Sequence, residues 1–463
     1  MKRLLNKYWK DVVIFCIPFL IFILVLLMYY PGIIPYDGNN QWQQVQNQMI
    51  SNAHPFFSTY FMLLLSKIWN NPLIVILFQI LVFSFSWMYM CNQTRNDKNF
   101  KWQVIYSVFV SFLPIICIYS ITLWKDVLYS YYLMILAFLT YKIGAKQNFK
   151  IKISQFIVLA ILLILIFSYR HNGMIVVCFY LLFISFLYFK YNKEKRKNII
   201  LLYLVFIVLL GIISVPKTYY LNKSNKSEND TDEKSESIIN HYITWIFGEY
   251  LRDGIVSKKD KKFLNNISNV KTWGDVYSGY LINDSFVKNS YNNSYILKHE
   301  NKYRQMFVKY TIKRPDEFIK HYLRSDSLLL SPISIEKGYV YVFPFNSGER
   351  YSFDGMINSK IPSLEKVYTN FINVTMKTPL KYLYQPAIIL FGVLIIILIL
   401  KRKNIHNVYL LAISMILNTV SLLPINLAQD LRYVYINYLT LFVLGLILLE
   451  NNYLRKNKDR KSK

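Results

Sequence analysis

The stretch VVIFCIPFLIFILVLLMYY, residues 12–30, carries no charged residue and is long enough to cross a bilayer, which takes about 20 apolar residues. Comparable runs recur along the 463-residue chain, which is 54% hydrophobic and 17% charged. A soluble protein of this size would carry about 25% charged residues. The sequence therefore predicts an all-α polytopic membrane protein and excludes a soluble globular fold.

The charge pattern predicts how the chain crosses the membrane. The 54 Lys and Arg residues exceed the 26 Asp and Glu residues, and the basic ones gather in alternate short loops and at both ends. By the positive-inside rule these segments are cytoplasmic. The basic excess is thus a topology signal, and we expect a lipid bilayer and no nucleic acid as partner. Ten spans are expected, at roughly 12–30, 72–91, 102–120, 127–143, 153–169, 173–189, 198–216, 384–400, 406–425 and 433–450.

Three regions follow from these spans. Residues 1–216 form an N-terminal membrane domain of seven spans, with a first outer loop at 31–71. Residues 217–382 form a mostly helical extracytoplasmic domain that opens with a polar run and contains a helix starting at Pro315, with Phe318, Ile319 and Tyr322 on one face. Residues 383–463 supply three more spans and a basic cytoplasmic tail.

The apolar stretch PFFSTYFMLLLSKIW, residues 55–69, needs a separate decision. It is short for a span and carries Lys67, and a crossing here would place every later basic loop outside. We expect an interfacial or re-entrant helix after the first span. An additional span is the alternative.

Polar chemistry is expected outside the spans, because no Asp, Glu, Lys or Arg falls in the middle of any of them. Ion-coupled transporters usually carry such groups near the bilayer midplane. The four Cys residues have no metal-ligand spacing. The short outer segments instead concentrate the charged and polar candidates, which are Asp37, His54, Lys125, Asp126, Arg170, His171, Asn172, Asp430 and Arg432.

Each candidate also has a local structural interpretation. Asp37 can cap a helix beginning near Asn40, His54 and Pro55 can cap the next helix, and Arg170 can anchor a span to lipid headgroups. Lys125 and Asp126 can form a neutralised helix start, and Asp430 and Arg432 a local ion pair. Together these residues predict one outward-facing polar site, because five separate loops deliver them to the same level of the membrane.

The order of these motifs resembles that of the GT-C superfamily of membrane glycosyltransferases, and more closely a poorly characterised bacterial family within it. The matching features are PGIIPYDGNNQWQ at 31–43, the HP start at 54, LWKD at 123–126, KRPDEFIKHYL at 313–323, YRHNG at 169–173 and DLRYVY at 430–435. Many relatives carry a second acidic residue directly after the loop Asp, where this chain has Gly38. Whether the site takes a divalent metal is therefore open.

The resemblance implies transfer of a sugar from a polyprenyl-phosphate carrier at the outer face of a bacterial cell membrane. Asp37 would then be the catalytic base for the acceptor hydroxyl. Arg170, Lys125 and Arg432 would bind phosphate, with Arg432 alternatively holding Asp430, and His54, His171 and Asn172 would position hydroxyls or the headgroup. The acceptor would be a glycan, a lipid or a teichoic-acid-like polymer of the cell envelope. Two alternatives are a polymerase or ligase of lipid-linked glycans and a non-enzymatic transport or assembly protein.

Overall fold

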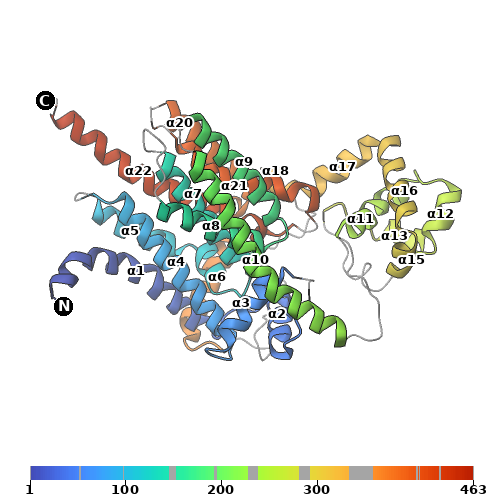
Figure 1. Cartoon of the computed structure of the whole chain (residues 1–463), viewed down its shortest axis with the longest axis horizontal. Coiled ribbons are helices and arrows are strands. Elements are labelled where there is room, and N and C mark those ends of the chain that lie inside the picture. Colours follow the sequence, from blue (N-terminus) through green and yellow to red (C-terminus); the bar gives the residue numbers. More distant parts are fainter. Residues whose placement is uncertain are drawn as a thin grey trace. The chain divides into compact units, whose positions relative to one another are not determined.

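The computed structural model is almost entirely helical (Figure 1). It describes residues 2–51, 54–96, 99–144, 153–191, 196–227, 238–280, 292–332, 358–402, 405, 407–426 and 429–461. Within these ranges no β-strand forms, and an isolated β-bridge joins Ile33 to Thr122. The all-α class expected from the sequence is confirmed.

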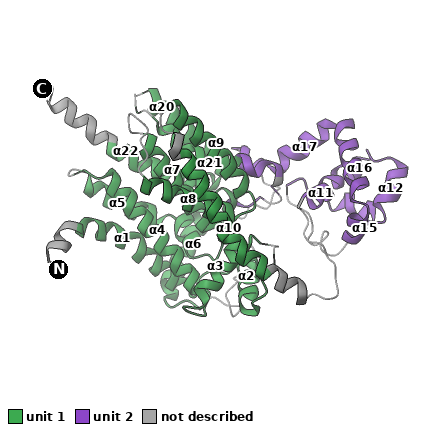
Figure 2. Ribbon diagram, viewed as in Figure 1, with its two compact units in different colours: residues 1–227, 342–419, 432–463 green, residues 228–341, 420–431 purple. Residues whose placement is uncertain are grey.

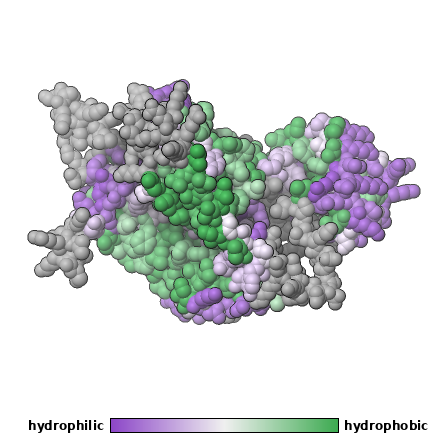
Figure 3. Space-filling model, in the orientation of Figure 1, coloured by the Kyte–Doolittle hydropathy of each residue, from purple (hydrophilic) through white to green (hydrophobic). Residues whose placement is uncertain are grey.

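The chain divides into two compact units, coloured green and purple in Figure 2. Unit 1 comprises residues 1–227, 342–419 and 432–463, and unit 2 comprises residues 228–341 and 420–431. Figure 3 shows hydrophobic residues over most of the visible face of unit 1 and mainly hydrophilic residues on that of unit 2. The visible surface of unit 1 is thus suited to apolar surroundings, and that of unit 2 is suited to water.

Unit 1 contains six helices that are long and apolar enough to cross a membrane, and these indicate a multi-pass membrane protein. They are α1 (Lys2–Met28), α4 (Leu73–Thr94), α7 (Lys125–Gly144), α9 (Gly173–Tyr191), α10 (Arg196–Ser227) and α22 (Ile436–Lys461).

A seventh crossing is formed if α5 (Phe100–Phe112) and α6 (Pro114–Ser120) are one span bent by 68°. The bend falls where Pro114 begins α6, because proline has no N–H to continue the hydrogen bonds of α5. The other predicted spans correspond to α8 (Ile153–Tyr169), α20 (Pro386–Arg402), and η2 (Val408–Leu411) with α21 (Ala412–Leu422). The arrangement of ten spans stays a prediction.

The apolar stretch after the first loop forms α3 (Phe56–Ser66), a helix of 11 residues. At 1.5 Å per residue it is about 16 Å long, about half of the hydrocarbon thickness. It packs against α2 (Tyr36–Asn47), α4 and α8 within unit 1. The helix is thus shorter than the predicted spans that α1, α4 and α7 form, and its interfacial or re-entrant position stays a prediction.

Charged side chains of unit 1 pair at both ends of its apolar helices. At one end, Asp11 contacts Arg95 at 2.6 Å and Lys142 contacts Glu450 at 3.4 Å. Lys125 begins α7 and Lys142 lies in its last turn, about 25 Å further along the axis. The residues around Lys125 form the second polar layer, described below.

Unit 2 is a helical unit around an aromatic core that includes Phe247, Trp273, Tyr303 and Tyr310. This agrees with the expected mostly helical domain. Its helices are α11 (Ile238–Arg252), α12 (Lys258–Leu264), α13 (Val270–Asp275), α15 (Asn293–Lys298), α16 (Glu300–Lys313), α17 (Pro315–Ser325) and α18 (Ser327–Leu330), followed much later in the chain by η3 (Leu423–Ile425).

The limits of unit 2 differ from the predicted domain at 217–382. Helix α10 continues to Ser227, and the polar run beyond it lies partly outside the described residues. Helix α19 (Pro362–Lys377) belongs to unit 1, where the Tyr29 hydroxyl lies 2.8 Å from that of Thr369.

Residues 420–431 belong to unit 2, although they lie outside the predicted domain at 217–382. We call them the return segment. The Gln429 amide donates to the Ser325 carbonyl oxygen at 2.6 Å and accepts from the Leu328 N–H at 2.8 Å. The Asn426 amide donates to the same Ser325 oxygen at 2.7 Å. These amides tie the return segment to the α17–α18 junction.

Helix α17 begins at Pro315, as the sequence predicts. Phe318 and Tyr322 pack against the core, but Ile319 is 55% exposed, so the prediction for Ile319 was wrong. The buried row is Glu317, His321 and Ser325, spaced four residues apart. Ile319 lies two residues from its members, which turns its side chain about 200° away from them.

Asp326 follows α17 and is fully buried. Asn426 of the return segment is its polar neighbour. Burial raises the pKa of Asp326 to about 8, because a carboxylate loses its hydration there. The folded unit therefore holds this carboxyl protonated at neutral pH.

The pKa of Asp326 predicts a pH-dependent stability. A carboxyl whose pKa rises on folding stabilises the fold fully below its unfolded value of about 4, and this stabilisation is lost as the pH rises to the folded value. We expect the unfolding temperature of the full chain in detergent to fall by several degrees between pH 6.5 and 8.5, and Asp326→Asn to reduce that fall. Asp316→Asn, at an exposed position of the same unit, is the control. An unchanged fall in Asp326→Asn would contradict the assignment.

Candidate functional site

A backbone contact fixes where the first loop of unit 1 meets the start of α7. The Ile33 N–H donates to the Ile121 carbonyl oxygen at 3.0 Å, and the Leu123 N–H donates to the Ile33 oxygen at 2.8 Å. The turn before it uses Gly32 at a φ of +106°, a conformation that residues with a Cβ rarely adopt. This bridge places the segment that leads into α2 beside the segment that leads into α7.

Helix α2 then packs directly on the backbone at Leu123. A Cβ at position 38 would overlap the Leu123 carbonyl oxygen, so only glycine allows this approach. The helix begins at Tyr36 and its N-cap is Pro35, which makes Asp37 the second helical residue. The interpretation of Asp37 as the cap of a helix near Asn40 was therefore wrong.

Four charged side chains form an alternating row at this point. Asp37 Oδ2 lies 2.7 Å from Arg432 Nη1, and Arg432 Nε lies 3.9 Å from Asp126 Oδ2. Asp126 Oδ1 lies 2.8 Å from Arg170 Nη1. We call Asp37, Arg432, Asp126 and Arg170 the charged row. It joins α2, the start of α7, the end of α8 and the segment before α22.

Aromatic rings hold the two guanidinium groups of the charged row. Arg432 lies over Trp124 at 4.9 Å and over Tyr433 at 5.2 Å, measured from Cζ to the ring centroid. Arg170 lies over Tyr433 at 4.6 Å and over Tyr129 at 5.6 Å. Tyr433 therefore contacts both guanidinium groups, and the contacts combine cation–π attraction with a defined orientation.

The buried side-chain amide of Asn418 holds two of the residues that carry these rings. The Asn418 side chain of α21 donates to the Tyr433 carbonyl oxygen at 2.9 Å and accepts from the Tyr129 hydroxyl at 3.1 Å. It also accepts from the Asn172 amide at 3.3 Å. Asn172 thus reaches the site through Asn418 and fixes the end of α8 relative to α21.

Lys125 and His54 form the second contact of the site. Lys125 Nζ lies 3.2 Å from His54 Nδ1. An ammonium group only donates, so Nδ1 accepts and the neutral ring carries its proton on Nε2. The N-cap of α3 is Pro55 with no side-chain hydrogen bond, so the interpretation of His54 as part of a helix cap was wrong.

The electrostatics of the site separate its two carboxylates. Burial acts to raise the pKa of Asp37, but the charges of Arg432 and Lys125 outweigh it and hold that pKa well below its usual range. Burial, together with the Lys125 charge, lowers the pKa of His54. The Asp37 side chain is 29% exposed and that of Asp126 only 3%. An incoming molecule can therefore reach Asp37, while Asp126 serves to neutralise the two arginines.

The structure brings most of the predicted site residues together in unit 1. Asp37, His54, Lys125, Asp126, Arg170 and Arg432 form one cluster, and Asn172 joins it through Asn418. His171 is exposed and lies between Arg170 and Asn172 in the sequence. Asp430 is buried and belongs to unit 2, while Arg432 pairs with Asp37.

Sequence reasoning missed the supporting residues Trp124, Tyr129, Asn418 and Tyr433. Trp124 and Tyr433 lie within the motifs LWKD and DLRYVY, so their position beside a charged residue was the available signal. Tyr129 lies one helical turn after Lys125, on the same side of α7. Asn418 had no local signal, because it is one of several polar residues of α21, together with Ser414, Thr419 and Ser421.

The donor set of this site does not fit a divalent metal. Asp37 and Asp126 are each paired with an arginine, and Lys125 adds a third cation. A metal ion would have to displace these pairs while adding two positive charges. Gly38, directly after Asp37, has no space for a side chain, so no second carboxylate can stand at this position.

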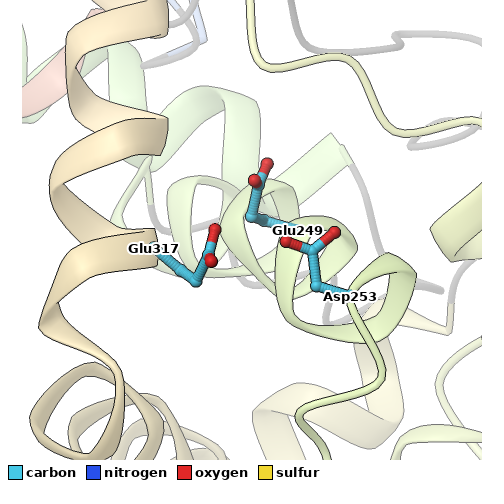
Figure 4. A group of neighbouring side chains, drawn as sticks. All are labelled: Glu249, Asp253 and Glu317. Atoms are coloured by element: carbon cyan, nitrogen blue, oxygen red, sulfur yellow. The ribbon is translucent and has the colours of Figure 1, made fainter.

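A second group of carboxylates lies in unit 2 and comprises Glu249, Asp253 and Glu317, whose oxygens can approach within 4.8 Å of one another (Figure 4). Each already has a cationic partner. Arg252 contacts Glu249 at 2.7 Å and Asp253 at 3.0 Å. Arg324 contacts Glu249 at 3.0 Å, and Arg314 contacts Glu317 at 2.8 Å. This group is an ion-pair network that ties α11 to α17.

Comparison of the chain with protein-family models, curated proteins and solved structures gave no match. The functional argument therefore depends on the chemistry of the site and on the motifs that form it.

Gly38 provides a test of how α2 positions Asp37. We expect Gly38→Ala to destabilise the fold by about 1–3 kcal/mol, because α2 must move away from Leu123. Thermal unfolding of the purified chain measures this loss. Gly211→Ala in α10 is the matched control, since a Cβ there meets no atom within 4 Å. Equal stability of the two variants would contradict the close packing of α2.

Proposed function

We propose that this chain is a membrane glycosyltransferase of the GT-C type, which transfers a sugar from a polyprenyl-phosphate carrier to a cell-envelope acceptor. The observation that supports this most is the cluster of Lys125, Arg170 and Arg432 around a reachable carboxylate, Asp37. Guanidinium forks and an ammonium group are the side chains that bind phosphate in proteins. A carboxylate beside them supplies a base for an acceptor hydroxyl.

The charge of the cluster favours a monophosphate-linked donor. Lys125, Arg170 and Arg432 contribute three positive charges, Asp37 and Asp126 contribute two negative charges, and His54 is neutral, which leaves one positive charge. A sugar linked to a polyprenyl monophosphate carries one negative charge and balances it. A diphosphate-linked donor, which a polymerase or ligase of lipid-linked glycans would use, carries two.

An apolar cavity of unit 1 supports a lipid-linked substrate. Its volume is about 320 Å³, and its walls come from α5, α6, α20, α22 and the 3-10 helix η1 (Pro379–Tyr384). Phe109, Ile389, Leu441 and Phe442 are among its lining residues, and Phe109 is exposed at its rim. A cavity with such walls among apolar helices suits a hydrocarbon chain rather than a polar solute.

The proposed reaction is a displacement at the anomeric carbon. The acceptor oxygen forms a bond to that carbon while the bond to the phosphate oxygen breaks, and the phosphate keeps the electron pair. Asp37 takes the proton from the acceptor hydroxyl. The arginines and Lys125 stabilise the negative charge that grows on the departing phosphate, which is the larger electrostatic effect of the site.

Placement in the membrane follows from the charge pattern of the sequence. The basic loops and both ends would be cytoplasmic, so the charged row would face the outside of a bacterial cell. Unit 2 would then be extracytoplasmic and would contribute to acceptor selection. A non-enzymatic transport or assembly protein would need neither Asp37 nor the two arginines.

A donor screen tests the proposed function. The purified full chain is incubated with sugars linked to a polyprenyl monophosphate or to a polyprenyl diphosphate, and transfer to cell-envelope acceptors is measured. We expect transfer from the monophosphate donor. Transfer from diphosphate donors alone would favour the polymerase or ligase, and no transfer from either would contradict both.

The catalytic role of Asp37 is tested by Asp37→Asn, which keeps the size of the side chain. We expect transfer to fall by a factor of about 100 or more, because a general base contributes about 10²–10⁴ to the rate. Asp11→Asn is the control, since Asp11 is also paired with an arginine but at the other polar layer of unit 1. Full activity of Asp37→Asn would remove this residue from the mechanism.

A further inference from the structure

On the basis of the proposed function, we propose that Asp37 and the donor phosphate compete for Arg432, so that donor binding releases the Asp37 carboxylate to act as the base. The site would then assemble its base only when the donor is present.

The exposure of the two ion pairs determines which one a phosphate can open. The side chains of Arg432 and Asp37 are 14% and 29% exposed, whereas those of Arg170 and Asp126 are 11% and 3% exposed. A phosphate that approaches from the accessible side therefore meets the Asp37–Arg432 pair first. The Asp126–Arg170 pair is the more shielded of the two.

Arg432 stays in place when Asp37 moves away. Its guanidinium lies over the rings of Trp124 and Tyr433, and its Nε remains 3.9 Å from Asp126. Trp124 precedes α7 and is buried. These contacts do not involve Asp37, so phosphate replaces Asp37 at an arginine that is already oriented.

Asp37 has room to respond, because it lies in the first turn of α2 with its carboxylate partly exposed. A change of its side-chain torsion angles is enough to break the contact between Oδ2 and Nη1. The backbone of α2 stays where Gly38 packs against Leu123. The switch thus requires no movement of a helix.

Replacement of Asp37 by phosphate at Arg432 makes the Asp37 carboxylate more basic. Before the donor binds, the charge of Arg432 helps to hold the pKa of Asp37 well below its usual range, so the carboxylate is a poor proton acceptor. A bound phosphate neutralises Arg432 and places a negative charge nearby. Both effects raise the pKa of Asp37, which brings the base closer to the operating pH.

Binding of farnesyl phosphate to the full chain in detergent tests the competition without requiring any sugar transfer. We expect Asp37→Asn to bind this probe about tenfold more tightly than the wild type, because the amide competes weakly for Arg432. Arg432→Gln should bind it more weakly, and Asp11→Asn should match the wild type. Asp37→Ser serves as a second variant if Asp37→Asn does not fold.

Equal or weaker binding by Asp37→Asn and Asp37→Ser would overturn the competition, even if wild-type transfer is observed. Tighter binding together with lost transfer is the expected pattern. If the wild type transfers no sugar but Asp37→Asn still binds farnesyl phosphate more tightly, the proposed function fails while the competition at Arg432 stands. The two proposals are therefore distinguished by separate measurements.

Discussion

Charge neutralisation at the end of an apolar helix bundle is the constraint on which this structure depends. A buried or half-buried charge needs an opposite partner, because its hydration is lost. In the charged row, positive and negative side chains alternate in space, so each one has an oppositely charged neighbour. The order is Asp37, Arg432, Asp126 and Arg170. Each pair also joins two segments of unit 1, so the same contacts that neutralise charge determine how the helix ends meet.

The aromatic rings and amides around the charged row fix the orientation of its two guanidinium groups. Tyr433 contacts both guanidinium groups, and Asn418 holds Tyr433 through its carbonyl oxygen. Arginines held by planar rings keep their forks oriented, which a phosphate requires and a simple charge pair does not. The site therefore resembles an anion-binding surface with oriented arginines, in which the carboxylate of Asp37 pairs with Arg432.

The sequence predicted the helical class, the helix at Pro315 and most of the charged candidates, because long apolar runs and isolated charges are local signals. It did not predict that residues 420–431 belong to unit 2, since the apolar pattern there continues that of a span. The alternative interpretation of Asp37 as a helix cap was wrong because the packing of Gly38 on Leu123, 85 positions away in the sequence, has no local pattern. The pairing of Arg432 with Asp37 was missed for the same reason.

The order in which the ribosome makes the chain gives the Asp37–Arg432 pair a further meaning. Its members are 395 residues apart, and Arg432 directly follows the return segment that completes unit 2. During synthesis Asp37 and Asp126 are made long before Arg432, because all helices of unit 1 except α22 precede Arg432 in the chain. A chain truncated before residue 420 leaves Asp37 without this guanidinium and unit 2 without its last segment, so a single truncation leaves both units incomplete.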